Sequence, residues 1–187
     1  MKKNLQIILI FLLIGCQNEN KKTAYKSNKL TTISETQKPT RSGKIKFLET
    51  QKTLNKQLEK FIGKAVFIDT WFTSCGSCIK QFKYTKKLEH YFNENDIVSL
   101  YICFGKNKDT AKWKELIYQY QLTGYHVFLE SENIAEYKKN FRTNLKKSLF
   151  HGAPRYMIID KKGKLVDGFA PRPIEKQKLI NVISRAL

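Results

Sequence analysis

The sequence predicts an α/β domain with a central mixed β-sheet and helices on both faces, and three observations lead to this fold class. Apolar runs typical of strands buried on both faces occupy residues 65–71 and 97–104. Amphipathic segments with helical spacing follow these runs at 76–92 and 109–120. Near the C-terminus, Lys161-Lys162-Gly163 separates two further apolar segments, which predicts an antiparallel hairpin.

The other elements complete an alternating order of helices and strands. In chain order we expect a helix at 53–62 ended by Gly63, a short strand at 125–129, a helix at 132–141, hairpin strands at 155–160 and 164–169, and a helix at 174–187. Asp109 or Thr110 can cap the helix at 109–120. Right-handed crossovers then place parallel strands at the centre of the sheet and the hairpin at its edge.

Composition limits the classes of protein to consider. The chain has 187 residues, of which 41% are hydrophobic, so it can bury a core and is not wholly disordered. No apolar run reaches the roughly 18 residues of a membrane-spanning helix. The net charge of +19 comes from an excess of Lys, with few Arg, scattered along the chain. Since nucleic-acid readers depend on Arg for base contacts, we expect a hydrated cationic surface and no nucleic-acid partner.

The N-terminus has the features of a secretion signal. Two lysines precede an apolar stretch at 5–14, which has the length of a signal-peptide core. The sequence Leu13-Ile14-Gly15-Cys16 resembles the bacterial lipobox, and this implies that Cys16 carries a lipid; the alternative is an ordinary signal peptide with a chance cysteine. We therefore expect a signal peptide at 1–15, a lipidated cysteine and flexible tether at 16–44, and a folded domain at 45–187. Such a protein would be lipid-anchored to a membrane of the cell envelope, with its domain in the periplasm.

The motif that carries chemistry is Cys75-Gly76-Ser77-Cys78, directly after the first buried strand and at the start of a helix. A C-x-x-C pair in a βα pattern is typical of thioredoxin-like redox sites. A helix N-terminus lowers the pKa of a thiol, which favours the reactive thiolate at Cys75. Gly76 lets a partner chain approach. The spacing lets the sulfurs bond, so Cys78 can displace a target from Cys75.

Other uses of these cysteines remain open at this point. A zinc site needs four ligands, and the remaining candidates have no ligand spacing: Cys103, His90, His126 and His151. A structural disulfide without activity is the other alternative. Cys103 lies within an expected strand, which favours a buried inert thiol over a third redox group. His151 is either a solvated loop residue or a neighbour of the motif. We expect no metal and no cofactor.

A second motif sharpens the assignment. Gly152-Ala153-Pro154 stands immediately before the strand at 155–160, where a cis proline bond is a recurring feature. The runs 65–78 and 152–166 together resemble the TlpA/ResA branch of the thioredoxin superfamily, which contains membrane-anchored thiol:disulfide oxidoreductases. The resemblance extends over roughly residues 50–187 and implies a thioredoxin-like fold.

The resemblance also implies residue roles. Cys75 would be the nucleophile, Cys78 the resolving thiol and Pro154 a cis proline facing the disulfide. The backbone of Ala153 would pair with a substrate strand. Asp69 matches the buried acid of the superfamily, whose raised pKa suits a proton acceptor for Cys78; a purely structural carboxyl is the alternative.

Further residues qualify the resemblance. Trp71, Gly76 and Ser77 are additional candidates for substrate contact. The sequence departs from the family pattern at Ser74, commonly Trp, and at Gln81, commonly an acid, so any proton exchange by that acid is lost or moved.

The function implied is reduction or isomerisation of protein disulfides in the envelope, with apocytochrome c among the possible targets. A membrane thiol transporter would supply electrons. The alternatives are a non-catalytic binding module with a structural disulfide and a metal chaperone.

Overall fold

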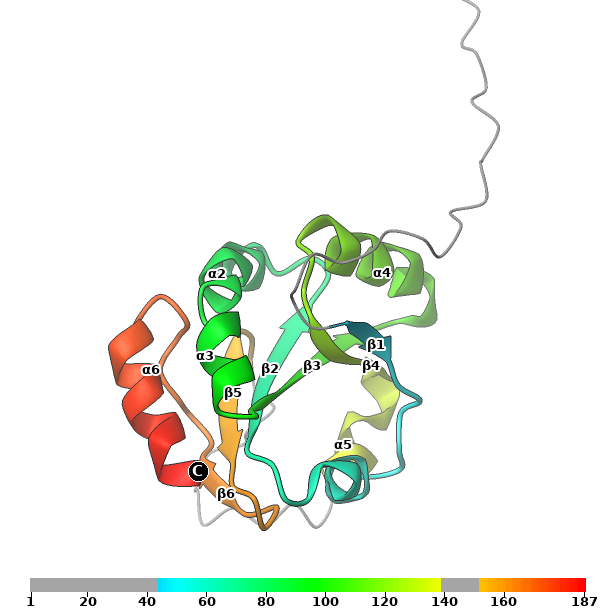
Figure 1. The fold of residues 1–187 in the computed structure, drawn as a ribbon. Coiled ribbons are helices and arrows are strands. Elements are labelled where there is room, and N and C mark those ends of the chain that lie inside the picture. The colour runs from blue at the N-terminus through cyan, green and yellow to red at the C-terminus, as the bar shows by residue number, and fades with distance from the viewer. Residues whose placement is uncertain (1–43, 139–151) are drawn as a thin grey trace, which may run out of the picture. The chain divides into compact units, whose positions relative to one another are not determined.

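The computed structural model describes residues 44–138 and 152–187, which include one six-stranded sheet in the order β1-β4-β3-β2-β5-β6 (Figure 1). The strands are β1 (Ile45–Phe47), β2 (Val66–Phe72), β3 (Val98–Gly105), β4 (Gly124–Glu130), β5 (Arg155–Ile159) and β6 (Leu165–Asp167). The first four strands pair in parallel, whereas β5 is antiparallel to both β2 and β6. The predicted mixed sheet with an antiparallel edge hairpin is confirmed.

Helices cover both faces of this sheet, as the alternating sequence predicts (Figure 1). They are α1 (Leu54–Leu58), α2 (Gly76–Lys86), α3 (Glu89–Glu94), α4 (Thr110–Gln119), α5 (Ile134–Tyr137) and α6 (Lys176–Ile183). Apolar residues of α1 and α5 pack on one face, while those of α2, α3, α4 and α6 pack on the other. None of the helices in the described ranges is long and apolar enough to cross a membrane.

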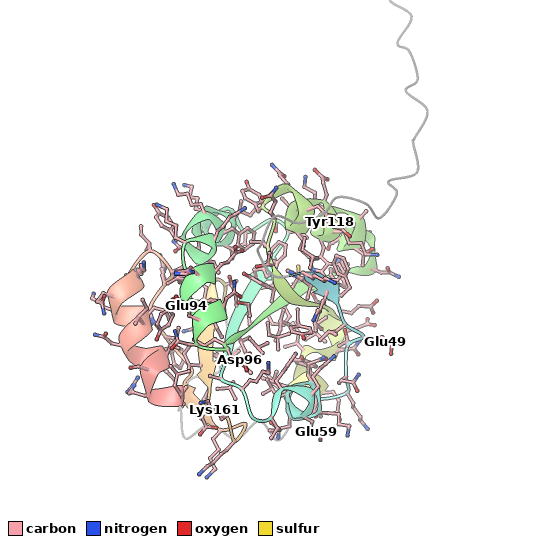
Figure 2. The ribbon with its side chains drawn as sticks, in the orientation of Figure 1. Glu49, Glu59, Glu94, Asp96, Tyr118 and Lys161 are labelled. Carbon is pink, nitrogen blue, oxygen red and sulfur yellow. A yellow bond between two sulfur atoms is a disulfide. The ribbon has the colours of Figure 1, made fainter. Side chains whose placement is uncertain are left out.

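The core follows the alternation of side chains along β2. Val66 and Ile68 face α1 and α5, whereas Phe67 and Trp71 face the opposite helix layer. All four are almost completely buried. Charged side chains such as Glu59 point away from this interior (Figure 2). Because β2 is covered on both faces, it holds the residues that follow it in a fixed position.

Several elements differ from the prediction. The helix expected at 53–62 is α1 followed by a 3₁₀ turn, Glu59–Phe61. The helix expected at 76–92 is divided into α2 and α3, since the backbone N–H groups of Lys87 and Leu88 bond three residues back and Leu88 turns into the core. Strand β1 was not expected, because its three half-exposed or exposed residues carry no strand pattern. Of the helix expected at 132–141, the described part is a 3₁₀ turn, Ser131–Asn133, followed by α5, and residues 139–141 lie outside the described ranges.

Some predictions concern residues outside the described ranges. These are the signal peptide at 1–15, the lipidated Cys16, the tether up to residue 43, and His151. Within the described ranges the fold begins with β1 at Ile45.

Candidate active site

Cys75 and Cys78 form a disulfide at the junction of β2 and α2, with their Cα atoms 5.3 Å apart. Cys75 is the N-cap of α2 and is partly exposed, while Cys78 lies one turn further along and has no exposed surface. The pair therefore has one sulfur within reach of another protein and one shielded from it. This asymmetry is what a nucleophile and a resolving thiol require.

Two hydrogen bonds converge on the Cys75 sulfur. The backbone N–H of Cys78 donates to Sγ at 3.2 Å. The Ser77 hydroxyl lies 3.4 Å from the same sulfur. A disulfide sulfur carries no hydrogen, so Ser77 must be the donor. In the reduced protein both groups, together with the start of α2, favour a thiolate at Cys75 over a thiol.

The Ala153–Pro154 peptide bond is cis, as predicted. The antiparallel register pairs Thr70 with Arg155, and the Thr70 hydroxyl donates to the Arg155 carbonyl at 3.2 Å. This pairing brings the two residues before Arg155 beside the end of β2, which leads into the disulfide. Gly152 has φ of +80°, which an L side chain would strain, so glycine is suited to this approach.

Asp69 lies in the middle of β2 with no exposed surface, and neither of its carboxyl oxygens has a hydrogen-bond partner among the described residues. Burial raises the pKa of Asp69 well above its ordinary value. Its neighbours across the sheet are Tyr101 on β3 and Tyr156 on β5. The predicted buried acid is thus present, and its proton exchange with Cys78 stays a prediction.

The structure corrects the prediction that Trp71 contacts substrate. Trp71 has no exposed surface and packs edge-on against Phe82, with ring centroids 5.1 Å apart. It shares a buried cluster with Cys78, and both Cys75 and Ala153 pack against that cluster. Trp71 therefore supports the disulfide from beneath.

Gly76, Ser77 and Ala153 differ from Trp71 in exposure. Gly76 and Ser77 are exposed and Ala153 is half-buried, so an incoming chain can reach all three. A Cβ atom added at Gly76 would meet nothing within 4 Å. The surface beside Cys75 is therefore open on the α2 side.

Gln81 has a structural role that the sequence did not indicate. It is buried on α2, one turn after Cys78, and its side-chain oxygen accepts the backbone N–H of Ile174 at 3.2 Å. The bond ties the segment before α6 to the active-site helix. Nothing in the sequence distinguishes this role from a solvated glutamine, because the partner is 93 positions away.

Of the other described candidates, Cys103 lies in the same buried cluster as Cys78, and His90 lies on the surface. Cys103 has no exposed surface, and burial with the nearby Asp109 charge raises the pKa of its thiol. His90 is exposed and lies 3.1 Å from Glu94. Within 44–138 and 152–187, no three His, Cys, Asp or Glu side chains are grouped as a metal site would need.

Solved structures with a similar fold are bacterial thiol-disulfide proteins. A Bacteroides vulgatus protein assigned as a thiol-disulfide oxidoreductase has a TM-score of 0.51 and 27% identity over 70% of this chain and 83% of that one. The thioredoxin domain of another Bacteroides vulgatus thiol-disulfide oxidoreductase has a TM-score of 0.55 and 22% sequence identity. The match covers 68% of this chain and 82% of that one. A Chlorobium tepidum protein assigned as the thiol:disulfide interchange protein DsbE has a TM-score of 0.53 and 20% sequence identity. The match covers 69% of this chain and 84% of that one.

The fold and the Cys75–Cys78 pair define a thioredoxin-like thiol:disulfide oxidoreductase. The Redoxin family model matches residues 27–183. The chain belongs to the Redoxin family. No curated protein sequence gives a significant match.

Proposed function

We propose that this oxidoreductase is a reductase of protein disulfides in the cell envelope, held at a membrane by a lipid on Cys16. The observation that carries the chemistry is the Cys75 sulfur, which is partly exposed and accepts two hydrogen bonds while its partner Cys78 is buried. The sequence signal at 1–16 supports the anchoring. The direction of electron flow follows from the family that the motifs resemble.

The reaction proceeds in two exchanges. The Cys75 thiolate attacks a target disulfide, forms a mixed disulfide with one target sulfur and expels the other as a thiolate, which takes a proton from solvent. The Asp69 carboxyl, once it has released its own proton, accepts the proton of the Cys78 thiol, and the Cys78 sulfur attacks Cys75. This second attack expels the remaining target sulfur, which is protonated in turn. Two electrons pass from the dithiol to the target, and the Cys75–Cys78 disulfide re-forms.

The surroundings of Cys75 suit an extended substrate. The Ala153 backbone would hydrogen-bond to the substrate strand, as in the family that the motif resembles. Gly76, next to Cys75 in the chain, leaves room for an incoming chain. A membrane thiol transporter would return the protein to its dithiol form, since an oxidising envelope does not itself keep thiols reduced.

The test is to trap substrates in the native envelope with a Cys78→Ser variant, which can form the mixed disulfide but cannot resolve it. We expect adducts that dithiothreitol releases, with envelope proteins such as apocytochrome c attached to Cys75 in the membrane fraction. The matched control is Cys75→Ser/Cys78→Ser, which should trap nothing. Equal adducts in both variants, or none in either, would contradict the proposal.

A further inference from the structure

A row of buried polar side chains crosses the sheet beneath the active-site helix. Tyr156 on β5, Asp69 on β2, Tyr101 on β3 and His126 on β4 are successive neighbours in the strand register. Each is at most 2% exposed. Polar groups in a core cost free energy unless they are paired or used, so the row calls for an explanation.

Asp69 poses the central difficulty, because it has to release one proton in every turnover. The proton taken from Cys78 cannot pass directly to water, since the carboxyl has no exposed surface. Burial favours the protonated acid and slows its release. The carboxyl therefore needs a polar neighbour that reaches solvent.

The titratable groups around Asp69 come from three strands and two helices. They are Tyr101 and Cys103 on β3, Tyr156 on β5, His126 on β4 beyond Tyr101, and Glu89 on α3, whose charge adds to burial in raising the pKa of Tyr101. Cys78 on α2 shares a buried cluster with Tyr101 and Cys103. The positive charge of Arg172, which precedes α6, partly offsets the burial that raises the pKa of Tyr156.

Tyr101 is the neighbour of Asp69 that lies closest to a surface pocket along its own strand. Ser99 lies two residues earlier on the same face of β3, and its hydroxyl is close enough to act on the Tyr101 hydroxyl. Ser99 is half-buried and lines a surface pocket of about 250 Å³ at the starts of β3 and β4. The Tyr101 hydroxyl is therefore one side chain away from the pocket.

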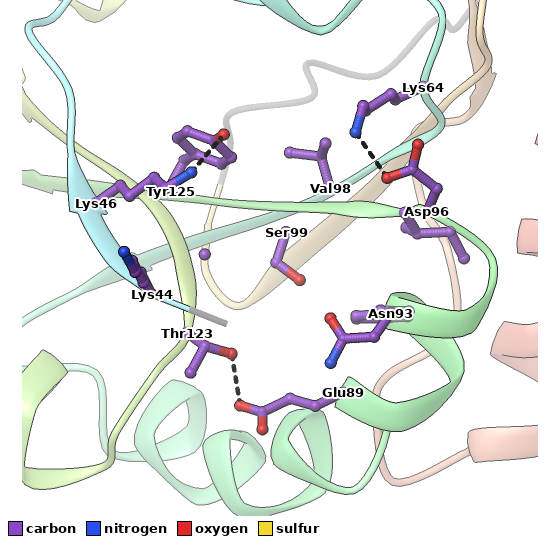
Figure 3. A pocket seen from close by; sticks show the side chains of 13 residues that line it. Lys44, Lys46, Lys64, Glu89, Asn93, Asp96, Val98, Ser99, Thr123 and Tyr125 are labelled. Carbon is purple, nitrogen blue, oxygen red and sulfur yellow. Dashed lines mark hydrogen bonds and ion pairs between the residues drawn. The ribbon is translucent and has the colours of Figure 1, made fainter. Parts of the chain in front are cut away.

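The pocket itself is polar around Ser99. Figure 3 shows the Ser99 side chain facing the space beside Asn93 and Glu89 of α3. Thr123 closes one side by donating to Glu89 at 2.8 Å. Gly124 packs tightly against Ser99, since an added Cβ would lie 2.7 Å from the Ser99 carbonyl oxygen. A pocket with these walls can hold water next to Ser99.

The other members of the row do not continue the path. The Tyr156 hydroxyl has no hydrogen-bond partner among the described residues. His126 stacks on Tyr101 with ring centroids 4.8 Å apart and donates Nε2–H to the Leu122 carbonyl at 2.8 Å. Burial lowers the pKa of His126 to about 4, so the ring stays neutral and its proton stays on that bond.

We propose that the Tyr101 hydroxyl and Ser99 form the route by which Asp69 returns its proton to solvent in the pocket. The Tyr101 oxygen accepts the Asp69 proton and passes its own to Ser99, which passes its own to water, so the phenol remains neutral throughout. Asp69 and Tyr101 are not hydrogen-bonded to each other in the structure, so a side-chain rotation or one water molecule completes the contact. The inference rests on the proposed reductase cycle.

The test compares Tyr101→Phe with Tyr156→Phe. Each variant removes one buried hydroxyl beside Asp69, and of the two tyrosines only Tyr101 shares its strand face with Ser99 of the pocket. The full-length dithiol protein is mixed with an excess of a small aromatic disulfide, and decay of the Cys75 mixed disulfide is followed in H₂O and D₂O. Ser99→Ala is a milder second variant, in case Tyr101→Phe fails to fold.

We expect Tyr101→Phe to slow this decay about tenfold, less than the roughly 100-fold cost of losing an acid–base group, and to enlarge the solvent isotope effect. Ser99→Ala should act in the same direction, while Tyr156→Phe stays at the wild-type rate. Equal rates for the two Phe variants would overturn the route. A wild-type protein that never resolves its mixed disulfide would instead contradict the proposed function.

Discussion

Replacing Asp69 by Asn tests whether the buried carboxyl is neutral in the folded protein. Asp69 has no exposed surface, and its oxygens lack hydrogen-bond partners among the described residues, so nothing there stabilises a negative charge. Burial raises the pKa of Asp69 well above 3.8. In the unfolded chain the same carboxyl regains a pKa of about 3.9.

The sign of the pH dependence follows from this difference. The folded carboxyl holds its proton more tightly than the unfolded one, so its stabilising contribution is complete below the unfolded pKa. The contribution is lost as the pH rises toward the folded pKa. Within this window the free energy of unfolding falls by about 1.4 kcal/mol per pH unit from this group alone.

The assay is denaturant unfolding of oxidised wild-type protein and Asp69→Asn between about pH 5 and 7, where the acid in the unfolded chain is ionised. For each unit by which the pH rises, the free energy of unfolding of the wild type should fall by about 1.4 kcal/mol relative to the variant. This corresponds to a fall of about 3–6 °C in Tm. Groups other than Asp69 titrate in both proteins and cancel. Two curves that run parallel over this range would refute the assignment of a neutral carboxyl.

Three other changes test separate parts of the site. Ser77→Ala should slow iodoacetamide alkylation of Cys75 about fivefold, as loss of a ~1 kcal/mol hydrogen bond would; an unchanged rate means that the hydroxyl does not stabilise the thiolate. Phe82→Ala should lower the free energy of unfolding by about 3–5 kcal/mol in chemical denaturation, because its ring is fully buried; a loss below about 1 kcal/mol would show that the core closes around the cavity. Cys16→Ala should release the protein from the membrane fraction, and retention after a salt wash would count against lipid anchoring.

The sequence predicted the parts of the fold that are encoded locally. The runs around Phe67 and Ile102 are apolar on both faces, which only a covered central strand can satisfy. The C-x-x-C pair, Cys75 and Cys78, lies at a strand–helix junction that is visible in the chain itself. The cis bond at Pro154 was also predicted, from the resemblance of residues 152–166 to a family whose strand begins with such a proline.

Features that depend on distant partners were not predicted. Strand β1 exists through backbone pairing with β4, and its own residues carry no pattern. Trp71 was a candidate for substrate contact, but strand alternation turns it toward Phe82 in the core. The Gln81–Ile174 bond and the Tyr101 neighbour of Asp69 require the register of the folded sheet.

The central claim is that Cys75 exchanges disulfides with other proteins while Cys78 resolves the product. The most direct measurement is dithiothreitol-driven reduction of insulin by wild type, Cys75→Ser and Cys103→Ser, the last being a buried thiol outside the pair. We predict that wild type and Cys103→Ser accelerate the reaction equally and that Cys75→Ser falls to the uncatalysed rate. Catalysis that survives in Cys75→Ser, or that is absent from wild type, would contradict the account.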